Sequence, residues 1–160
     1  MSKEEVSEID VLVRKGITED SDDIVRFQQV MAFETEGKVL NAATLKSGVA
    51  AMFSSYANGF YLVAEGEGKL IGSLLITYEW SDWRNATYWW IQSVFVLPEW
   101  RRKGIYRSMH DYVLNIAVSR RDICGIRLYV DHGNEIAQRT YMDLGMVHSN
   151  YDLYEMDVVF

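Results

Sequence analysis

The spacing of the apolar residues changes around Pro98, the single proline of this chain. Before it, Tyr88–Val96 is rich in aromatic and β-branched residues, which is typical of a β-strand. After it, from Lys103 onwards, apolar residues recur at helical spacing, at positions Ile105, Met109, Tyr112, Val113, Ile116 and Ala117. An amphipathic helix that follows a strand packs its apolar face on the sheet. The sequence therefore predicts a layered fold of mixed α/β class.

Further strands and helices are predicted on both sides of this segment. The predicted strands cover residues 9–14, 59–64, 70–80, 88–96, 123–130 and 151–159. The predicted helices cover residues 22–36, 42–55, about four turns from Lys103, and 134–144. Ser21 and Asn41 are expected to cap the first two helices, and Gly145 to close the last. The predicted order is close to βααββββαβαβ, with a mostly antiparallel front half.

Length and composition favour one compact domain. The chain has 160 residues, of which 49% are hydrophobic, and this is enough apolar material for a continuous core. We expect a single domain over residues 1–160, with residues 1–8 flexible. No apolar run approaches the roughly 20 residues that a membrane span needs, and the acidic start does not resemble a signal peptide. A cytoplasmic protein is therefore expected.

Charge and cysteine content narrow the classes of function. The formal net charge of −7 argues against nucleic acid or an anionic membrane as the main partner, because both are bound through basic surface. Cys124 is the single cysteine, so the chain can form neither an internal disulfide nor a cysteine metal cluster. The apolar segment around Cys124 predicts a buried, unreactive side chain. No metal site is expected.

The start of the helix after Pro98 has the most informative chemistry. Four of the chain's 16 lysines and arginines lie within residues 101–107, where the helix dipole is already positive. Cations are unfavourable there unless an anion binds, and free backbone amides beside Gly104 would suit a diphosphate. A solvated basic patch is the alternative. Two other phosphate loops are excluded: the chain has no G-x-x-x-x-G-K-[ST], and its remaining closely spaced glycines belong to a predicted hairpin, at Gly66, Gly68 and Gly72.

Two motifs in this region resemble those of the Gcn5-related N-acetyltransferase (GNAT) family. Val94–Trp100 matches V-x-V-x-P-x-aromatic, and Arg101–Tyr106 is similar to the Q/R-x-x-G-x-G/A acetyl-CoA signature. The second motif is N-x-x-A-x-x-x-Y-x-x-x-G, matched by Asn134, Ala137, Tyr141 and Gly145. One position departs from the family: Tyr106 replaces the last glycine or alanine, so either the diphosphate turn opens or the tyrosine points away.

The resemblance implies a GNAT fold with a cleft between two central parallel strands, and an enzyme that transfers the acetyl group of acetyl-CoA directly to an amine. Backbone groups of Val94 and Val96 would pair with the pantetheine arm, and the Val94 amide would lie near the thioester oxygen. Amides from Arg102 to Arg107 would hold the diphosphate, and Asn134 would contact the arm. The full set of implied cofactor contacts is Val94, Phe95, Val96, Arg101, Arg102, Lys103, Gly104, Ile105, Tyr106, Arg107, Asn134 and Tyr141.

The same resemblance assigns the catalytic acid, whereas the base has to be sought among other residues. Tyr141 would return a proton to the leaving thiolate. Many family members have a glutamate as base on the strand before the signature, but that position here is Gln92, which cannot accept a proton at neutral pH. Glu79 on the preceding strand is our candidate, acting through a water molecule, and an exposed carboxylate without function is the alternative. His132 and Asp131 are weaker candidates.

The acceptor amine and the partners stay open at this point. Aromatic residues crowd the hairpin before the cofactor strand, and those outside the core could line an acceptor pocket or a homodimer contact; they are Trp80, Trp83, Tyr88, Trp89 and Trp90. The acceptor could be a small molecule or a protein amino group. Gln92 and Tyr106 also permit a second hypothesis, a degenerate acyl-CoA-binding sensor without turnover. An unrelated phosphate-binding α/β domain would leave Asn134 and Tyr141 unexplained.

Overall fold

The computed structural model describes residues 10–158 of the chain. We predicted that residues 1–8 are flexible, and these residues lie outside the described range. The same holds for residue 9 of the first predicted strand and residue 159 of the last. The chain divides into two compact units, one up to Leu128 and one from Tyr129 onwards. The single domain over residues 1–160 stays a prediction.

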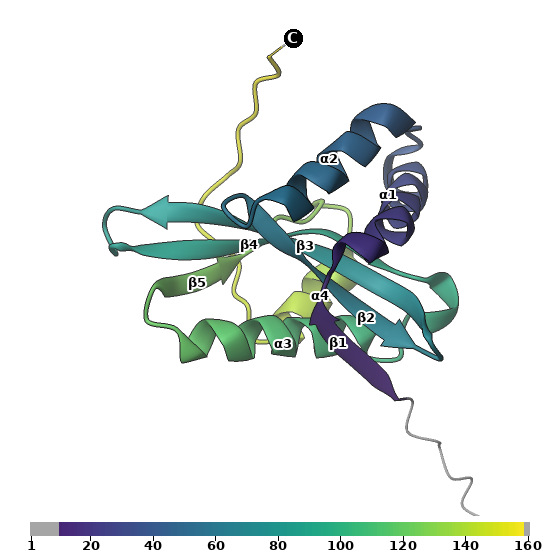
Figure 1. Ribbon diagram of the computed structural model, residues 1–160. Coiled ribbons are helices and arrows are strands. Elements are labelled where there is room, and N and C mark those ends of the chain that lie inside the picture. Colours follow the sequence, from purple (N-terminus) through teal and green to yellow (C-terminus); the bar gives the residue numbers. More distant parts are fainter. Residues whose placement is uncertain (1–9, 159–160) are drawn as a thin grey trace, which may run out of the picture. The chain divides into compact units, whose positions relative to one another are not determined.

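The first unit contains a five-stranded sheet with the order β1-β2-β3-β4-β5. Its strands are β1 (Val11–Lys15), β2 (Gly59–Gly66), β3 (Lys69–Ser81), β4 (Ala86–Val96) and β5 (Ile123–Arg127). The first four strands pair antiparallel, and β5 pairs parallel to β4. This mixed sheet, drawn in Figure 1, confirms the predicted fold class.

A tight turn between β2 and β3 begins the antiparallel half of the sheet. Gly66 pairs with Lys69, so two residues form the turn between them. These residues, Glu67 and Gly68, have φ angles of 53° and 73°. Two successive left-handed residues match the twist of the flanking strands, which explains why a glycine-bearing segment forms the hairpin.

Three helices cover the two faces of this sheet. α1 (Ser21–Glu36) and α2 (Ala42–Ser54) lie on one face and α3 (Ile105–Ser119) on the other, as Figure 1 shows. The Asn41 side chain accepts a hydrogen bond of 2.9 Å from the Thr44 amide, which confirms its predicted role as a cap. The predicted cap Ser21 is wrong. A 3-10 turn over Thr18–Asp20 runs directly into α1, and Ser21 is its first helical residue.

Each sheet face has its own apolar core. Toward α3, the core joins sheet residues such as Leu74 and Ile76 to Met109 and Val113 of the helix. Toward α1 and α2, Ile24, Phe27, Val49, Val63 and Phe95 are among the residues packed together. Of the aromatic hairpin residues, Trp89 is buried, whereas Trp83 is 92% exposed. Cys124 is half-buried, not fully buried as predicted.

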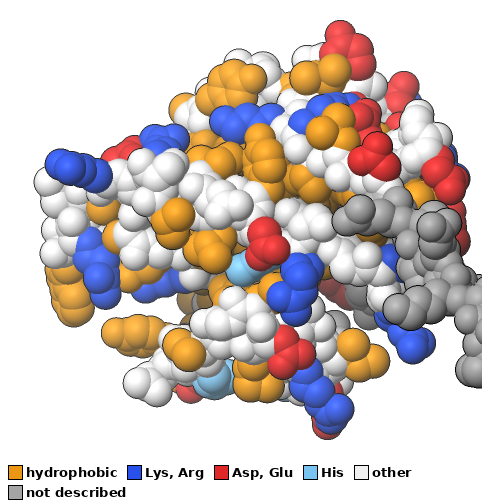
Figure 2. Space-filling view, turned by 90° about the horizontal axis from the view of Figure 1, so that it is seen from below, with side chains coloured by type: hydrophobic (Ala, Val, Ile, Leu, Met, Phe, Trp, Pro, Cys, Tyr) orange, Lys and Arg blue, Asp and Glu red, His pale blue; other side chains and the backbone are white. Residues whose placement is uncertain are grey.

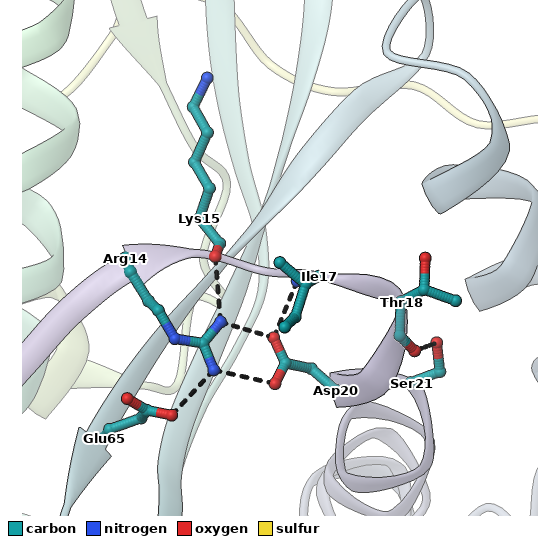
Figure 3. Close-up of polar contacts among 7 residues, drawn as sticks. All are labelled: Arg14, Lys15, Ile17, Thr18, Asp20, Ser21 and Glu65. Carbon is teal, nitrogen blue, oxygen red and sulfur yellow. Dashed lines mark hydrogen bonds and ion pairs between the residues drawn. The ribbon is translucent and has the colours of Figure 1, made fainter.

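An ion pair between half-buried Arg14 and buried Asp20 fixes the connection from β1 into α1 (Figure 3). Arg14 donates two hydrogen bonds to the carboxylate of Asp20, at 2.8 and 3.0 Å, and one to Glu65 on β2 at 2.8 Å. The Ile17 amide also donates to Asp20, at 2.8 Å. Burial alone would raise the pKa of Asp20, but the hydrogen bonds from Arg14 and Ile17 outweigh it and hold this pKa below its usual value. The network therefore holds α1 against the sheet.

The second unit contains one helix among its described residues, α4 (Glu135–Asp143). The observed order is βααβββαβα. The three strands between α2 and α3 match the three predicted ranges, so the predicted order has one strand too many there. The predicted last strand is not formed over residues 151–158, which are all exposed and irregular. An alternating pattern makes a strand only when a neighbouring strand pairs with it, and no such pairing is present among the described residues. Also, β5 ends at Arg127, three residues before its predicted end.

Charges of both signs are mixed on the surface. On the face drawn in Figure 2, basic and acidic side chains are interspersed, with hydrophobic side chains between them. None of the described helices is long and apolar enough to span a membrane. Within residues 10–158, no group of three or more His, Cys, Asp or Glu side chains is arranged to hold a metal ion.

Candidate active site

Strand β4 is paired with β5 over only part of its length. Their parallel ladder begins at Thr87 and Ile123 and ends at the pair Trp90 and Arg127. Strand β4 continues beyond this last pair to Val96. From Ile91 onwards, the edge of β4 that faced β5 has no strand of the first unit beside it. We predicted that the two parallel strands are central in the sheet. In the observed sheet β5 is an edge strand, so this part of the prediction is wrong.

A β-bulge lies in this part of β4, which is paired with β3 but not with β5. Leu75 of β3 pairs with Gln92 and Ser73 pairs with Phe95, so one residue of β3 faces two residues of β4. Ser93 takes a left-handed φ of 51°. Phe95 consequently packs toward α1 and α2, while Val94 and Val96 pack toward α3. A bulge bends its strand, so β4 presents main-chain groups here that do not continue the ladder with β5.

The chain then runs through a 3-10 turn at Pro98–Trp100 into the start of α3. Gly104 is the N-cap of α3, with φ 80° and no side-chain hydrogen bond to the helix. Its carbonyl accepts the first helical hydrogen bond from Ser108, at 3.0 Å. The amides of residues 105–107 come before that first donor, so the helix geometry gives them no partner within α3. This is the arrangement of an anion site.

Gly104 borders open space. A Cβ atom built on Gly104 would meet no atom within 4 Å. The requirement for glycine therefore comes from its left-handed backbone and not from a neighbouring protein atom. The space beside Gly104 is therefore open.

The basic side chains at this helix start have different partners. Arg101 donates from Nε to the Val96 carbonyl at 2.8 Å and from Nη2 to Glu34 at 2.7 Å, so its guanidinium holds the loop to β4 and α1. The Lys103 ammonium lies 5.2 Å from the centre of the Trp100 ring. Arg102 and Arg107 are exposed and make no side-chain hydrogen bond or ion pair within residues 10–158. These two side chains are the available cations.

Tyr106, the departure from the family signature, is half-buried and packs against the core on the α3 side. Its ring centre lies 6.1 Å from that of His110, one turn further along α3. Of the two outcomes considered from the sequence, the structure has the tyrosine packed back on its own helix. The turn at Gly104 is therefore not blocked by this side chain.

Glu79 belongs to a cluster on the sheet face toward α1 and α2. Its Oε2 accepts a hydrogen bond of 2.5 Å from the Trp90 indole, and its Oε1 accepts one of 2.7 Å from Nη1 of Arg127. The Arg127 guanidinium lies 3.6 Å from the centre of the Tyr88 ring. On the same face, Gln92 donates to the Thr77 hydroxyl at 2.5 Å.

These contacts bear on the candidate base. Both carboxylate oxygens of Glu79 already accept a hydrogen bond, so a base role has to use a remaining lone pair. Gln92 is held by Thr77 and has no basic atom. The sequence reasoning missed Arg127. Its signal was a single arginine in a short, otherwise apolar or small-residue strand, Ile123–Arg127, where a charged side chain requires a partner.

The second unit places the other predicted residues on α4 and before it. The Asn134 side chain accepts a hydrogen bond of 3.1 Å from the Ala137 amide, so the three-residue spacing of the motif is that of a helix cap. Gly145 ends the helix with φ 88°, as predicted. Tyr141 is half-buried, and burial raises the pKa of its phenol. The phenol therefore keeps its proton at neutral pH.

The two weaker base candidates hold the loop before α4. The Asp131 carboxylate accepts a hydrogen bond of 2.6 Å from the Gly133 amide. Gln138 donates to the backbone carbonyls of Asp131 and His132, at 3.1 and 3.0 Å. The Asp131 side chain therefore has a structural role, whereas the contact of His132 is made by its backbone alone.

A separate groove of about 570 Å³ lies beside α1. It is lined by a mixture of apolar and charged side chains from α1, β3, β4 and the 3-10 turn after β4, namely Asp23, Arg26, Phe27, Val30, Lys69, Leu70, Phe95, Leu97, Pro98 and Glu99. Phe95 is the single predicted cofactor contact among them. This groove therefore does not coincide with the helix start at Gly104.

Comparison with known proteins identifies the family of this arrangement. The profile of the acetyltransferase (GNAT) family matches residues 27–146, a range that includes both sequence motifs. The chain belongs to the GNAT family. A crystal structure of a possible acetyltransferase from Clostridium difficile 630 is 40% identical to this GNAT protein, with a TM-score of 0.88, over 96% of this chain and all of that one.

More distant GNAT-like structures share the fold alone. A ribosomal-protein-alanine N-acetyltransferase from Brucella melitensis biovar Abortus 2308 is 14% identical, with a TM-score of 0.76, over 94% of this chain and 100% of that one. An aminoglycoside acetyltransferase, HMB0005, from an uncultured soil metagenomic sample is 15% identical, with a TM-score of 0.73, over 94% and 100%. A search of curated proteins finds no match.

Proposed function

We propose that this GNAT protein is an acetyl-CoA-dependent N-acetyltransferase that transfers the acetyl group directly to an amine in a ternary complex. The observation that carries the proposal is the succession of an unpaired stretch of β4 and a helix start with open amides at Gly104. A pantetheine arm can pair with an extended strand edge, and a diphosphate needs amide donors and positive charge. Neighbouring segments of this chain offer the strand edge and the amide donors.

The residues of the first unit divide the binding of acetyl-CoA between them. We assign the pantetheine arm to the main chain of Val94 and Val96, and the diphosphate to the amides from Arg102 to Arg107. The exposed Arg102 and Arg107 side chains add positive charge there. The role that fits the contacts of Arg101 is to hold the loop, because its guanidinium is already bonded to Val96 and Glu34.

Beyond binding its substrates, the protein has to contribute to the reaction in two ways. As the amine nitrogen bonds to the thioester carbon and the carbon–sulfur bond breaks, negative charge develops first on the carbonyl oxygen and then on sulfur. We assign stabilisation of the oxygen to the Val94 amide, and the proton for the sulfur to the Tyr141 phenol. The raised pKa of Tyr141 supports this role, because an acid must still hold its proton when the thiolate leaves.

The amine has to be neutral when it attacks. The contacts of Glu79 with Arg127 and Trp90 favour a positioning role over the predicted role of base. We therefore propose that the neutral fraction of the amine in solution is the nucleophile, with its second proton released to water. Without a strong protein base, the rate should rise with pH toward the pKa of the acceptor amine.

A second candidate function is an acyl-CoA sensor that binds the cofactor without turnover. The observation that favours it is Gln92, whose amide donates to Thr77 at the position where many family members have a base. The GNAT fold is compatible with either activity. Tyr141 favours the enzyme, since a sensor has no use for an acid beside a thiolate.

The test is thiol release from acetyl-CoA with a panel of small amines, polyamines, amino acids and peptides, together with calorimetric titration of CoA. The enzyme predicts CoA binding and at least one amine that is acetylated. CoA binding with no turnover across the panel would favour the sensor. Absence of CoA binding would contradict both.

A further inference from the structure

The guanidinium of Arg127 uses only part of its hydrogen-bonding capacity. Nη1 donates to Glu79, and the planar group is stacked 3.6 Å from the centre of the Tyr88 ring. A guanidinium has five N–H donors, and within residues 10–158 no other acceptor bonds to this one. The side chain is 35% exposed. Arg127 is thus held by two contacts, and none of the described residues accepts a hydrogen bond from its Nε or Nη2.

A second guanidinium shares the Tyr88 ring with Arg127. The Arg84 guanidinium also lies over the Tyr88 ring, 5.8 Å from its centre, and Glu79 is the carboxylate bonded to this cluster. Two cations therefore accompany one anion. A singly charged planar carboxylate fits a free guanidinium edge through two parallel hydrogen bonds. A phosphate would bring about two negative charges close to Glu79, which is less favourable.

The position of Arg127 connects this anion site to the proposed reaction. Arg127 and Trp90 are the last pair of the β4–β5 ladder, and β4 runs from there into its unpaired stretch. The strand alternation places Glu79, Trp90 and Arg127 on the face toward α1 and α2, opposite to the side of Val94 and Val96. An anion on Arg127 would therefore lie where the strands part, across the sheet from α3.

We propose that Arg127 recognises a carboxylate of the acceptor, so that the acceptor is an amine that also carries a carboxylate, as an α-amino acid does. The inference rests on the proposed function, because it assigns the second substrate of the same site. Glu79 and Trp90 act as positioning residues. The indole holds the Glu79 carboxylate, and the carboxylate holds one end of the guanidinium, which leaves the other edge for the substrate.

The experiment compares amines with and without the carboxylate. The probes are the matched pairs L-lysine and cadaverine, L-tyrosine and tyramine, L-tryptophan and tryptamine, and also O-phosphoethanolamine and ethanolamine. Binding to the full chain saturated with CoA is measured by calorimetry, and kcat/KM with acetyl-CoA by thiol release. We expect at least one amino acid to exceed its decarboxylated partner by about tenfold or more, the scale of a charge-assisted hydrogen bond.

Variants connect the preference to the residue. Arg127→Gln should lower kcat/KM about tenfold for the amino acid and less than about threefold for its decarboxylated partner. The Glu79→Gln/Arg127→Gln double variant should also lose the preference, without leaving a lone carboxylate on the sheet. The matched control is Arg120→Gln, which removes a guanidinium from another ion pair, that with Asp122, and should keep the preference.

Three results would overturn the inference: no advantage of any amino acid over its partner, a larger advantage for O-phosphoethanolamine, or an unchanged preference in both variants of Arg127. The test is the ratio of kcat/KM for the amino acid to that for its decarboxylated partner. A purely structural defect would lower both values together and leave this ratio unchanged. CoA binding in the same titrations separates this inference from the proposed function. If the wild-type chain binds CoA and shows no carboxylate preference, the acceptor assignment alone fails.

Discussion

Nη1 of Arg127 lies 2.7 Å from Oε1 of Glu79, so a side-chain bond crosses β4 and joins the edge strand β5 to β3. The bond is at the level where the β4–β5 ladder ends, and Trp90 of that last pair donates to the same carboxylate. The point at which the two parallel strands separate is thus fixed by side chains as well as by the main chain. Glu79 is part of this connection, which changes what its substitution should do.

Glu79→Gln separates a positioning role from a base. As a positioning residue, its replacement should lower kcat/KM by less than about tenfold and leave the shape of the pH profile unchanged. Loss of a general base would cost about a hundredfold or more and would remove the dependence on its titration. The measurement is kcat/KM from pH 6 to 9 for both proteins. A hundredfold loss would restore Glu79 as the base.

Tyr141→Phe tests the proposed acid. Phenylalanine keeps the ring and removes only the donor, so kcat should fall by about tenfold to a thousandfold, with little change in CoA affinity or melting temperature. Because burial raises the pKa of Tyr141 above its usual 10.0, no loss of rate from its ionisation is expected below about pH 10. Steady-state kinetics beside a thermal melt distinguish a loss of catalysis from a loss of stability. An unchanged kcat would exclude Tyr141 from the mechanism.

Local signals in the sequence predicted the elements that frame the site. Asn41 and Gly145 were correctly placed as helix ends, because a cap or a left-handed glycine is fixed by one or two residues. Gly104 was found in the same way, since cations at a helix start need an anion. These inferences use the immediate neighbours of each residue and do not require knowledge of the fold.

Features that depend on distant partners were not predicted. Arg127 became visible only when the sheet brought it to Glu79, which is 48 positions away. The last predicted strand failed for a related reason: residues 151–158 have the alternating pattern, but their strand state depends on a neighbour that a pattern cannot supply. Ser21 was one position from the true cap, because the 3-10 turn before α1 has no clear sequence signal.

Asp20→Asn should destabilise the fold through the connection of β1 to α1. The Asp20 side chain is 8% exposed and accepts two hydrogen bonds from Arg14, so the free energy of unfolding at pH 7 should fall by about 2 kcal/mol or more. Urea denaturation measures it. The control is Asp23→Asn. Because the Asp23–Arg26 pair is exposed, this variant should lower the free energy of unfolding by less than about 1 kcal/mol.

The same pair predicts a pH dependence. The folded pKa of Asp20 is below its ordinary value of 3.8, so its stabilisation is complete above that pH and is lost as pH falls through the folded pKa. The difference in unfolding free energy between the wild type and Asp20→Asn should therefore shrink between pH 5 and pH 2. A difference that stays constant over this range would show that the carboxylate charge does not contribute.

The most direct measurement is calorimetric titration of CoA into the wild-type chain, Gly104→Asp and Gly68→Asp. Gly68 is the matched control: it also has a left-handed φ, of 73°, and open space around a built Cβ, but it lies in the β2–β3 turn. The account predicts binding of one CoA per chain, at least about tenfold weaker in Gly104→Asp and unchanged in Gly68→Asp, because only the first carboxylate faces the open amides of α3. Equal affinity in all three proteins, or no binding by the wild type, would contradict it.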